Sequence, residues 1–199
     1  MRMIARILTD LHRVLSVRAV KARQRLYKEY DMSGILTNLF RYKAFADDEL
    51  LTSLASLGTE SPVTKLAIQA LSHSYVVDRI FAAHLRRTGH LYTSANLSQM
   101  PTLEQLSRDL RASDCEYVEY VRALNRADLV EQIDFTFTDG APGRMSREEM
   151  LMHVITHGVG HRGQVSAVMI LNSVTPPKDG FTTYLHRAEA QVRRRAAAA

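Results

Sequence analysis

The sequence predicts an all-α protein: a four-helix bundle with a short β-hairpin before the last bundle helix and an extra N-terminal helical segment. Two observations predict it. Four long stretches repeat apolar residues at helical spacing, and start or stop signals of helices bound them. One short stretch alternates apolar and polar residues as a strand does. Because a helix with one apolar face must bury that face, four of them favour a bundle.

The composition is that of a globular protein. The chain has 199 residues, of which 46% are hydrophobic and 24% charged, enough for one domain with a core. No apolar run is long enough to span a membrane, so we expect no transmembrane segment. Cys115 is the single cysteine, which excludes an internal disulfide and a thiolate-rich zinc site. We therefore expect a cytoplasmic protein whose metal ligands, if any, are histidines and carboxylates.

The positive charge is concentrated at the N-terminus. Residues 1–28 hold eight Lys and Arg against one acidic residue, whereas the remainder holds 18 against 20. The net charge of +5 therefore does not indicate a uniform nucleic-acid-binding face, and no nucleic-acid partner is expected. We expect three segments: a basic amphipathic extension (1–32), the bundle (33–187) and a frayed tail (188–199).

Three interpretations of residues 1–31 stay open. Their apolar residues fall at helical spacing among arginines, which is typical of a helix lying on a membrane surface or a partner. The segment also fits a helix packed on the bundle. Finally, it fits translated upstream sequence, because Met32 directly precedes a good helix start.

The first bundle helix is expected over residues 34–57, with Gly58 as its stop. Its predicted buried stripe is Ile35, Leu36, Leu39, Phe40, Tyr42, Phe45, Leu50, Leu51 and Leu54. The second helix is expected to begin with Ser61 as cap and Pro62 at its first position, to run to about Arg87 and to end near Gly89. Its predicted interior is Leu66, Ile68, Leu71, His73, Val76, Val77, Ile80, Phe81 and Leu85.

The second half of the chain carries clear boundary signals. A polar connection (88–101) leads to a third helix (102–125) that opens with a capping box. Alternation from Ile133 to Thr138, followed by the turn pair Asp139-Gly140, predicts a hairpin. A second capping box, Ser146 to Glu149, opens the last bundle helix, which we expect to end near Asn172.

The last helix presents histidines at intervals of four: His153, His157 and His161. Residues four apart share one helix face, so two of these imidazoles can meet one metal ion. A third ligand must come from elsewhere in the fold. By itself such a stripe is also typical of a solvated face, and His73, alone on an apolar face of the second helix, is typical of a satisfied core histidine.

Two motifs carry a resemblance to a known family. Residues 71–81, LSHSYVVDRIF, and residues 153–164, HVITHGVGHRGQ, resemble the second-helix and last-helix motifs of the DinB family. The likeness extends over residues 33–187. It implies a DinB/YfiT-like four-helix bundle, a divalent metal held by His73, His157 and His161, and a homodimer. Two positions depart from the family: Gly160 stands where a further histidine is common, and Phe81 where tryptophan is common.

Three neutral imidazoles would leave a bound ion its full charge and an open position, which is a catalytic arrangement. Zn, Ni and Fe all suit imidazole. The nearest characterised relatives imply transfer or isomerisation of a small electrophile with a low-molecular-weight thiol, and hydrolysis is the variant if no thiol fits. His153 and Gln164 are the candidates for helping groups near the ion.

Two other functions are open. The bundle could be a non-catalytic, stress-associated metal protein in which the ion ties helices together, or the basic N-terminus could bind nucleic acid or a membrane surface. Three residues are expected to serve structure: Arg162 in an ion pair, Asp78 as a salt-bridge partner between helices, and Cys115 as a small core residue.

Overall fold

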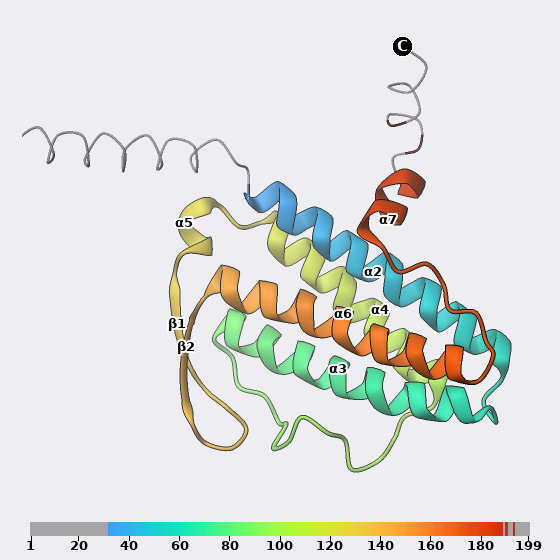
Figure 1. Cartoon of the computed structure of the whole chain (residues 1–199). Coiled ribbons are helices and arrows are strands. Elements are labelled where there is room, and N and C mark those ends of the chain that lie inside the picture. The colour runs from blue at the N-terminus through green and yellow to red at the C-terminus, as the bar shows by residue number, and fades with distance from the viewer. Residues whose placement is uncertain (1–31, 189, 191–192, 194–199) are drawn as a thin grey trace, which may run out of the picture.

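Figure 1 shows the computed structural model of the chain, which describes residues 32–188, 190 and 193. The elements in order are α2 (Met32–Leu57), α3 (Pro62–Arg86), α4 (Leu103–Arg122), α5 (Arg126–Leu129), β1 (Gln132–Thr136), β2 (Pro142–Ser146), α6 (Arg147–Leu171) and α7 (Phe181–Ala188). The predicted helical bundle, with a hairpin before the last long helix, is confirmed. The helix predicted for residues 1–31 and most of the predicted tail lie outside the described residues.

The four long helices run side by side, with α2 packed on α4 and α3 packed on α6. The hairpin lies at one end of the bundle, and its strands are antiparallel, with Gln132 opposite Ser146. The connection 88–101 runs along the outside of α3 before α4 begins (Figure 1). The short helix α7 returns to α2, where Tyr184 packs on Tyr42. α3 and α6 therefore lie next to each other on one side of the bundle.

The helix starts follow the predicted chemistry in two cases out of three. Thr102 and Ser146 each accept a hydrogen bond from the backbone amide three residues on, and both capping boxes are complete. Ser61 and Pro62 occupy the N-cap and first helical positions as predicted, but the side chain of Ser61 makes no capping hydrogen bond. Pro62, at the first helical position, has no amide hydrogen and so removes one of the unpaired amides at the start of this helix.

Two helix ends also differ from the prediction. The second helix runs to Arg86, close to the expected Arg87, but the left-handed residue that follows it is Arg87 (φ 55°) and not Gly89, and the amide of Thr88 bonds back to the carbonyl of Ala83. The third helix ends at Arg122 because Asn125 caps the next element, α5, instead of extending α4. The turn at Gly140 (φ 88°) is where the hairpin prediction placed it.

The two serines that precede α3 and α6, Ser61 and Ser146, give a matched test of helix capping. We expect Ser146→Ala to lower the free energy of unfolding by about 1 kcal/mol, since it removes the acceptor for the amide of Glu149. Ser61→Ala should cost no more than a few tenths, because that hydroxyl caps nothing. Urea unfolding of both variants measures the difference. Equal losses would contradict the capping assignment.

Two apolar cores fill the bundle, one towards the hairpin and one towards the opposite end. On α2 the first includes Leu36 and Phe40, and the second includes Leu50 and Leu54. Between them the interior is ionic, because Lys43 and Asp47 are buried at positions continuing the same stripe. The helix periodicity therefore buries charge as well as apolar surface at mid-bundle.

Three residues predicted to be buried are exposed. Ile35 is 37% and Leu66 49% exposed, because each lies on the solvent side of its helix. Cys115 is exposed too. The buried face of α4 contains Leu110, Asp114 and Tyr117. Cys115 is one residue after Asp114 and therefore lies about 100° around the helix from that face.

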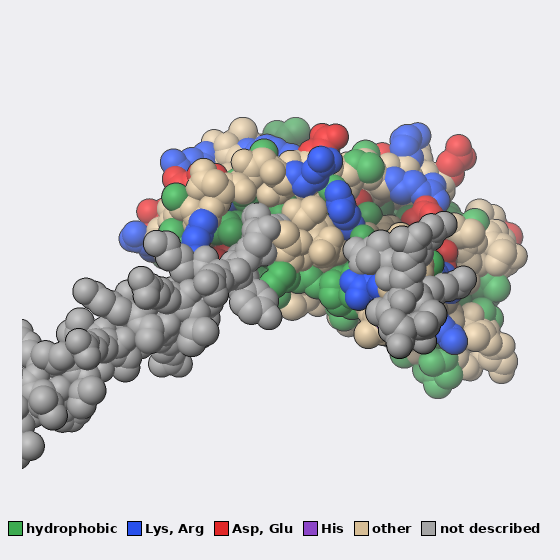
Figure 2. Space-filling view, turned by 90° about the horizontal axis from the view of Figure 1, so that it is seen from above, with side chains coloured by type: hydrophobic (Ala, Val, Ile, Leu, Met, Phe, Trp, Pro, Cys, Tyr) green, Lys and Arg blue, Asp and Glu red, His purple; other side chains and the backbone are tan. Residues whose placement is uncertain are grey.

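Within the described residues, no helix combines the length and apolarity needed to cross a membrane. Figure 2 shows the face that carries α2, where acidic and basic side chains are interspersed and neither sign forms a broad area.

Candidate metal centre

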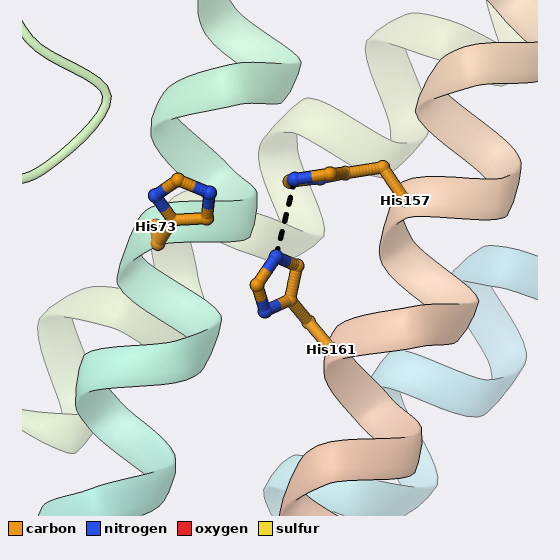
Figure 3. A group of neighbouring side chains, drawn as sticks. All are labelled: His73, His157 and His161. Atoms are coloured by element: carbon orange, nitrogen blue, oxygen red, sulfur yellow. Dashed lines mark hydrogen bonds between the residues drawn. The ribbon is translucent and has the colours of Figure 1, made fainter.

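Three histidines from two helices meet in the middle of the bundle. His73 comes from α3, and His157 and His161 come from successive turns of α6. One ring nitrogen of each lies within 4.8 Å of the others. The ring centroid of His73 is 5.2 Å from that of His157 and 4.8 Å from that of His161. Figure 3 shows the three rings turned towards the space between the helices.

Two amides fix the orientation of two of the rings. Nδ1 of His161 is 2.9 Å from Oε1 of Gln164, and Nδ1 of His73 is 3.1 Å from Oδ1 of Asn96. An amide oxygen only accepts hydrogen bonds, so both Nδ1 atoms carry the proton and donate it. Each Nε2 then keeps a free lone pair. Figure 3 shows these Nε2 atoms on the sides of the rings that face the other histidines.

His157 completes the group. Its Nε2 lies 3.1 Å from Nε2 of His161, and its ring is stacked 5.4 Å from that of His153. Its buried Nδ1 has no hydrogen-bond partner among the described residues. Burial, followed by the neighbouring histidines, lowers the pKa of His157 to about 4, and burial also lowers the pKa of His161. Both imidazoles are therefore neutral at pH 7, the form that binds a metal ion.

The two candidate helpers have different positions. Gln164 contacts a ligand candidate directly, and its hydrogen bond stays within α6, not with a neighbouring helix. His153 is half-buried one turn before His157, stacked on Phe81 with ring centroids 4.6 Å apart. It does not belong to the three-nitrogen group. Burial lowers the pKa of His153, so this ring too is neutral at pH 7.

An aromatic wall continues from His153 towards the hairpin. Phe81 lies 6.2 Å from Phe135 of β1, which in turn lies 4.9 Å from His84 and 4.8 Å from Phe137, all between ring centroids. Gly143 on β2 makes room for this wall, because a Cβ at that position would lie 2.5 Å from the Phe135 ring. The three-histidine group is thus flanked on one side by weakly polar rings.

A buried ionic cluster lies behind the histidines. The Lys43 ammonium lies 2.9 Å from Asp47, 2.9 Å from Asp78 and 2.6 Å from Asp114. Arg162 pairs with Asp47 at 3.1 Å and with Asp179 at 2.7 Å. Asp78 and Arg162 are therefore structural ion-pair residues, as predicted.

Sequence reasoning missed four residues of this region: Lys43, Asp47, Asp114 and Asn96. For the first three a signal existed, since they occupy the interior positions of their helices. Asn96 lies in an irregular connection, where no periodicity marks which polar residue turns inward.

Comparisons with known proteins identify the family and agree with the fold. Residues 32–195 match the DinB family. A crystal structure of a DinB-like protein from Bacillus cereus ATCC 10987 has the same fold, with a TM-score of 0.52 and 20% identity over 69% of this chain and 91% of that chain. No curated protein matches. The family match spans most of the chain and includes all three histidines, and so the protein belongs to the DinB family.

Proposed function

We propose that this protein binds a divalent metal ion through His73, His157 and His161 and acts as a metal-dependent enzyme on a small electrophilic molecule. The observation that carries the proposal is the convergence of three ring nitrogens within 4.8 Å from two helices. Family membership supports it. Nδ1 of His73 and Nδ1 of His161 each bond an amide oxygen, so the Nε2 atom of each ring keeps its lone pair. Metal-binding histidines are commonly oriented by such a partner.

The donor set fits Zn, Ni or Fe. Around a tetrahedral ion with bonds of about 2.0–2.1 Å, ligand nitrogens lie about 3.3–3.4 Å apart. The 3.1 Å between Nε2 of His157 and Nε2 of His161 is close to this value. Small rotations of the side chains would complete the set. No carboxylate belongs to the group, so the ion would keep its full double charge.

A divalent ion bound there supplies positive charge that lowers the pKa of a coordinated water or thiol. The surrounding residues would orient the imidazoles, accept a proton and contact the substrate. Gln164 and Asn96 orient two imidazoles. His153, neutral and half-buried, is placed to accept a proton beside His157. Phe81 and Phe135 offer an apolar wall to a small substrate. These features favour transfer or isomerisation with a low-molecular-weight thiol, or hydrolysis where water takes its place.

An activity screen tests the enzyme proposal. Metal-loaded protein is incubated with small electrophiles, each with cysteine, glutathione, coenzyme A or no thiol, and product is followed by mass spectrometry. We expect product formation that is lost both in chelated protein and in His157→Ala. Turnover that survives either treatment would contradict a metal-dependent reaction.

A non-catalytic role is the second candidate, because an ion held by these residues would join α3 to α6. In that case chelation should lower the melting temperature sharply, while no thiol perturbs the absorption spectrum of Co²⁺- or Ni²⁺-substituted protein. A thiol-induced change in that spectrum would favour the enzyme.

We also propose a homodimer, as the family resemblance implies. The solvent side of α6 supports it, since this face exposes Met152, Val159, Ile170 and Leu171. Light scattering coupled to size-exclusion chromatography tests it, and a monomer mass at micromolar concentration would contradict it.

The hydrogen bond from His161 to Gln164 gives a specific prediction. Gln164→Leu keeps a side chain of similar size but removes the acceptor, so His161 loses the partner that fixes its tautomer. We expect Zn²⁺ affinity to fall about 10–100-fold, the usual effect of losing such a partner. Competition with a chromophoric chelator measures it. Gln132→Leu, at an exposed glutamine of β1, is the control and should leave affinity unchanged.

A further inference from the structure

The middle of the bundle contains a charged layer, by which we mean the ionic cluster between the two apolar cores. It consists of Lys43, Asp47, Asp78, Asp114, Arg162 and Asp179. On α2, α4 and α6 the layer separates residues of one core from residues of the other; on α4, for example, Asp114 lies between Leu110 and Tyr117. The layer thus fills one cross-section of the bundle.

The three histidines lie in that same cross-section. On α3, His73 and Asp78 both fall between Leu71 of one core and Phe81 of the other. On α6, Gly158 directly follows His157, and a Cβ at Gly158 would lie 3.3 Å from Cε of Lys43. The three-histidine group and the charged layer are therefore adjacent in the bundle.

The layer has more acids than bases: four carboxyl groups face two cations. Lys43 is 1% exposed, and the carboxylates around it raise the pKa of its ammonium well above the usual value although burial opposes its charge. Asp47, between Lys43 and Arg162, has a lowered pKa despite its burial. The excess of negative charge therefore acts on the other acidic residues of the layer, which are Asp78, Asp114 and Asp179.

Two of those acids hold protons at unusually high pH. Burial raises the pKa of Asp78 to about 6 and that of Asp114 to about 8, although Lys43 opposes both shifts. Neither oxygen of Asp78 accepts a hydrogen bond from a described residue, although Oδ2 is in ion-pair contact with Lys43. The groups acting on Asp114 are Lys43, Asp47 and Asp78, from two neighbouring helices. With four carboxyl groups facing two cations, the layer favours keeping a proton near pH 7, and Asp114 has the more strongly raised pKa of these two acids.

We propose that the charged layer is the counter-charge of the metal site, so that uptake of a divalent ion by the three histidines releases one proton from Asp114 to solvent. This inference rests on the proposed metal binding and extends it. Three neutral imidazoles offset none of the ion's double charge, and charges inside a protein interact more strongly than in water. Loss of the proton reduces the gain of positive charge in the interior from two units to one.

Calorimetry tests the linkage. The full chain is titrated with Zn²⁺ at pH 7.5 in Hepes, Pipes and Tris, whose different ionisation enthalpies give the number of protons released. Three proteins are compared: wild type, Asp114→Asn, and Asp48→Asn. Asparagine imitates the protonated carboxyl group, so the first variant should keep the fold. Asp48 is an exposed residue of α2 paired with Arg111, and its variant controls for the loss of one negative charge.

We expect Asp114→Asn to release about one proton fewer than wild type, and Asp48→Asn to behave as wild type. At pH 8.5 the Zn²⁺ affinity of Asp114→Asn should be several hundredfold lower, roughly the effect of one carboxylate on a doubly charged ion at a helix-to-helix distance of about 8–10 Å and an effective dielectric constant of about 20. Equal proton release by all three proteins would overturn the inference and leave metal binding intact. A wild-type chain that binds no Zn²⁺ would overturn the proposed function instead.

A second measurement compares wild type with Asp114→Asn as the pH is varied. Between pH 7 and 8 wild type should release more protons than Asp114→Asn, because burial raises the pKa of Asp114 to about 8, whereas a metal-bound water would release its proton equally in both proteins. Release that falls to zero above pH 7 would also overturn the linkage.

Discussion

Replacement of His157 by alanine is expected to lower the affinity for Zn²⁺ by more than about 100-fold, beyond the effect of losing a residue that only orients a ligand. His157 contributes the nitrogen that lies 3.1 Å from Nε2 of His161. Without it, two imidazoles from different helices remain, and two ligands do not close a tetrahedral site. Competition with a chromophoric chelator at pH 7.5 gives the affinity.

The chain offers a matched control for this experiment. His186 lies on α7, where its Nδ1 contacts the carbonyl of Thr182, and it takes no part in the three-histidine group. His186→Ala should bind Zn²⁺ as wild type does. Equal affinity losses in the two variants, or none in His157→Ala, would show that the ion binds elsewhere.

Replacement of Lys43 by methionine is expected to lower the free energy of unfolding by about 3–5 kcal/mol, the usual cost of removing one partner from a buried ion pair. Methionine keeps the length of the side chain but removes the one cation that contacts Asp47, Asp78 and Asp114 together. The loss should shrink at pH 5. Buried carboxyl groups with raised pKa values take up protons there, and this removes their mutual repulsion.

Urea unfolding at pH 5 and pH 7.5 measures this effect. Lys65→Met is the control, because Lys65 pairs only with the exposed Glu60 and exposed pairs contribute little. A Lys43→Met protein as stable as the control at pH 7.5 would contradict the account of the charged layer.

Periodicity and capping chemistry predicted most of the fold. The boxes at Thr102 and Ser146 identified two helix starts because capping is local and needs only residues three apart. Two details at the ends of α3 were not predicted: the missing side-chain cap at Ser61 and the left-handed conformation of Arg87. A serine can precede a helix without capping it, and a left-handed residue need not be glycine.

Of the charged layer, only Asp78 and Arg162 were expected to form ion pairs, and the burial of Lys43, Asp47 and Asp114 was missed. On α2 the buried positions include Leu36, Phe40, Lys43, Asp47 and Leu50, spaced alternately by three and four. Lys43 and Asp47 therefore continue the apolar stripe, and strict attention to spacing would have placed them inside. The same spacing on α4 buries Asp114 and exposes Cys115.

The three histidines could be selected from the sequence only with the help of the family resemblance. Spacing by four joins His157 to His161 on one face, but it joins His153 to them equally well. The choice of His73 required knowledge of which faces of α3 and α6 meet. Asn96 was out of reach, because its contact with His73 depends on the path of an irregular connection.

X-ray absorption spectroscopy of the Zn²⁺-loaded full-length protein tests the metal centre most directly. We predict a first shell that includes three imidazole nitrogens at about 2.0–2.1 Å, and one imidazole fewer in His73→Ala. A spectrum with a sulfur ligand at about 2.3 Å in protein free of added thiol, or one unchanged by His73→Ala, would contradict it.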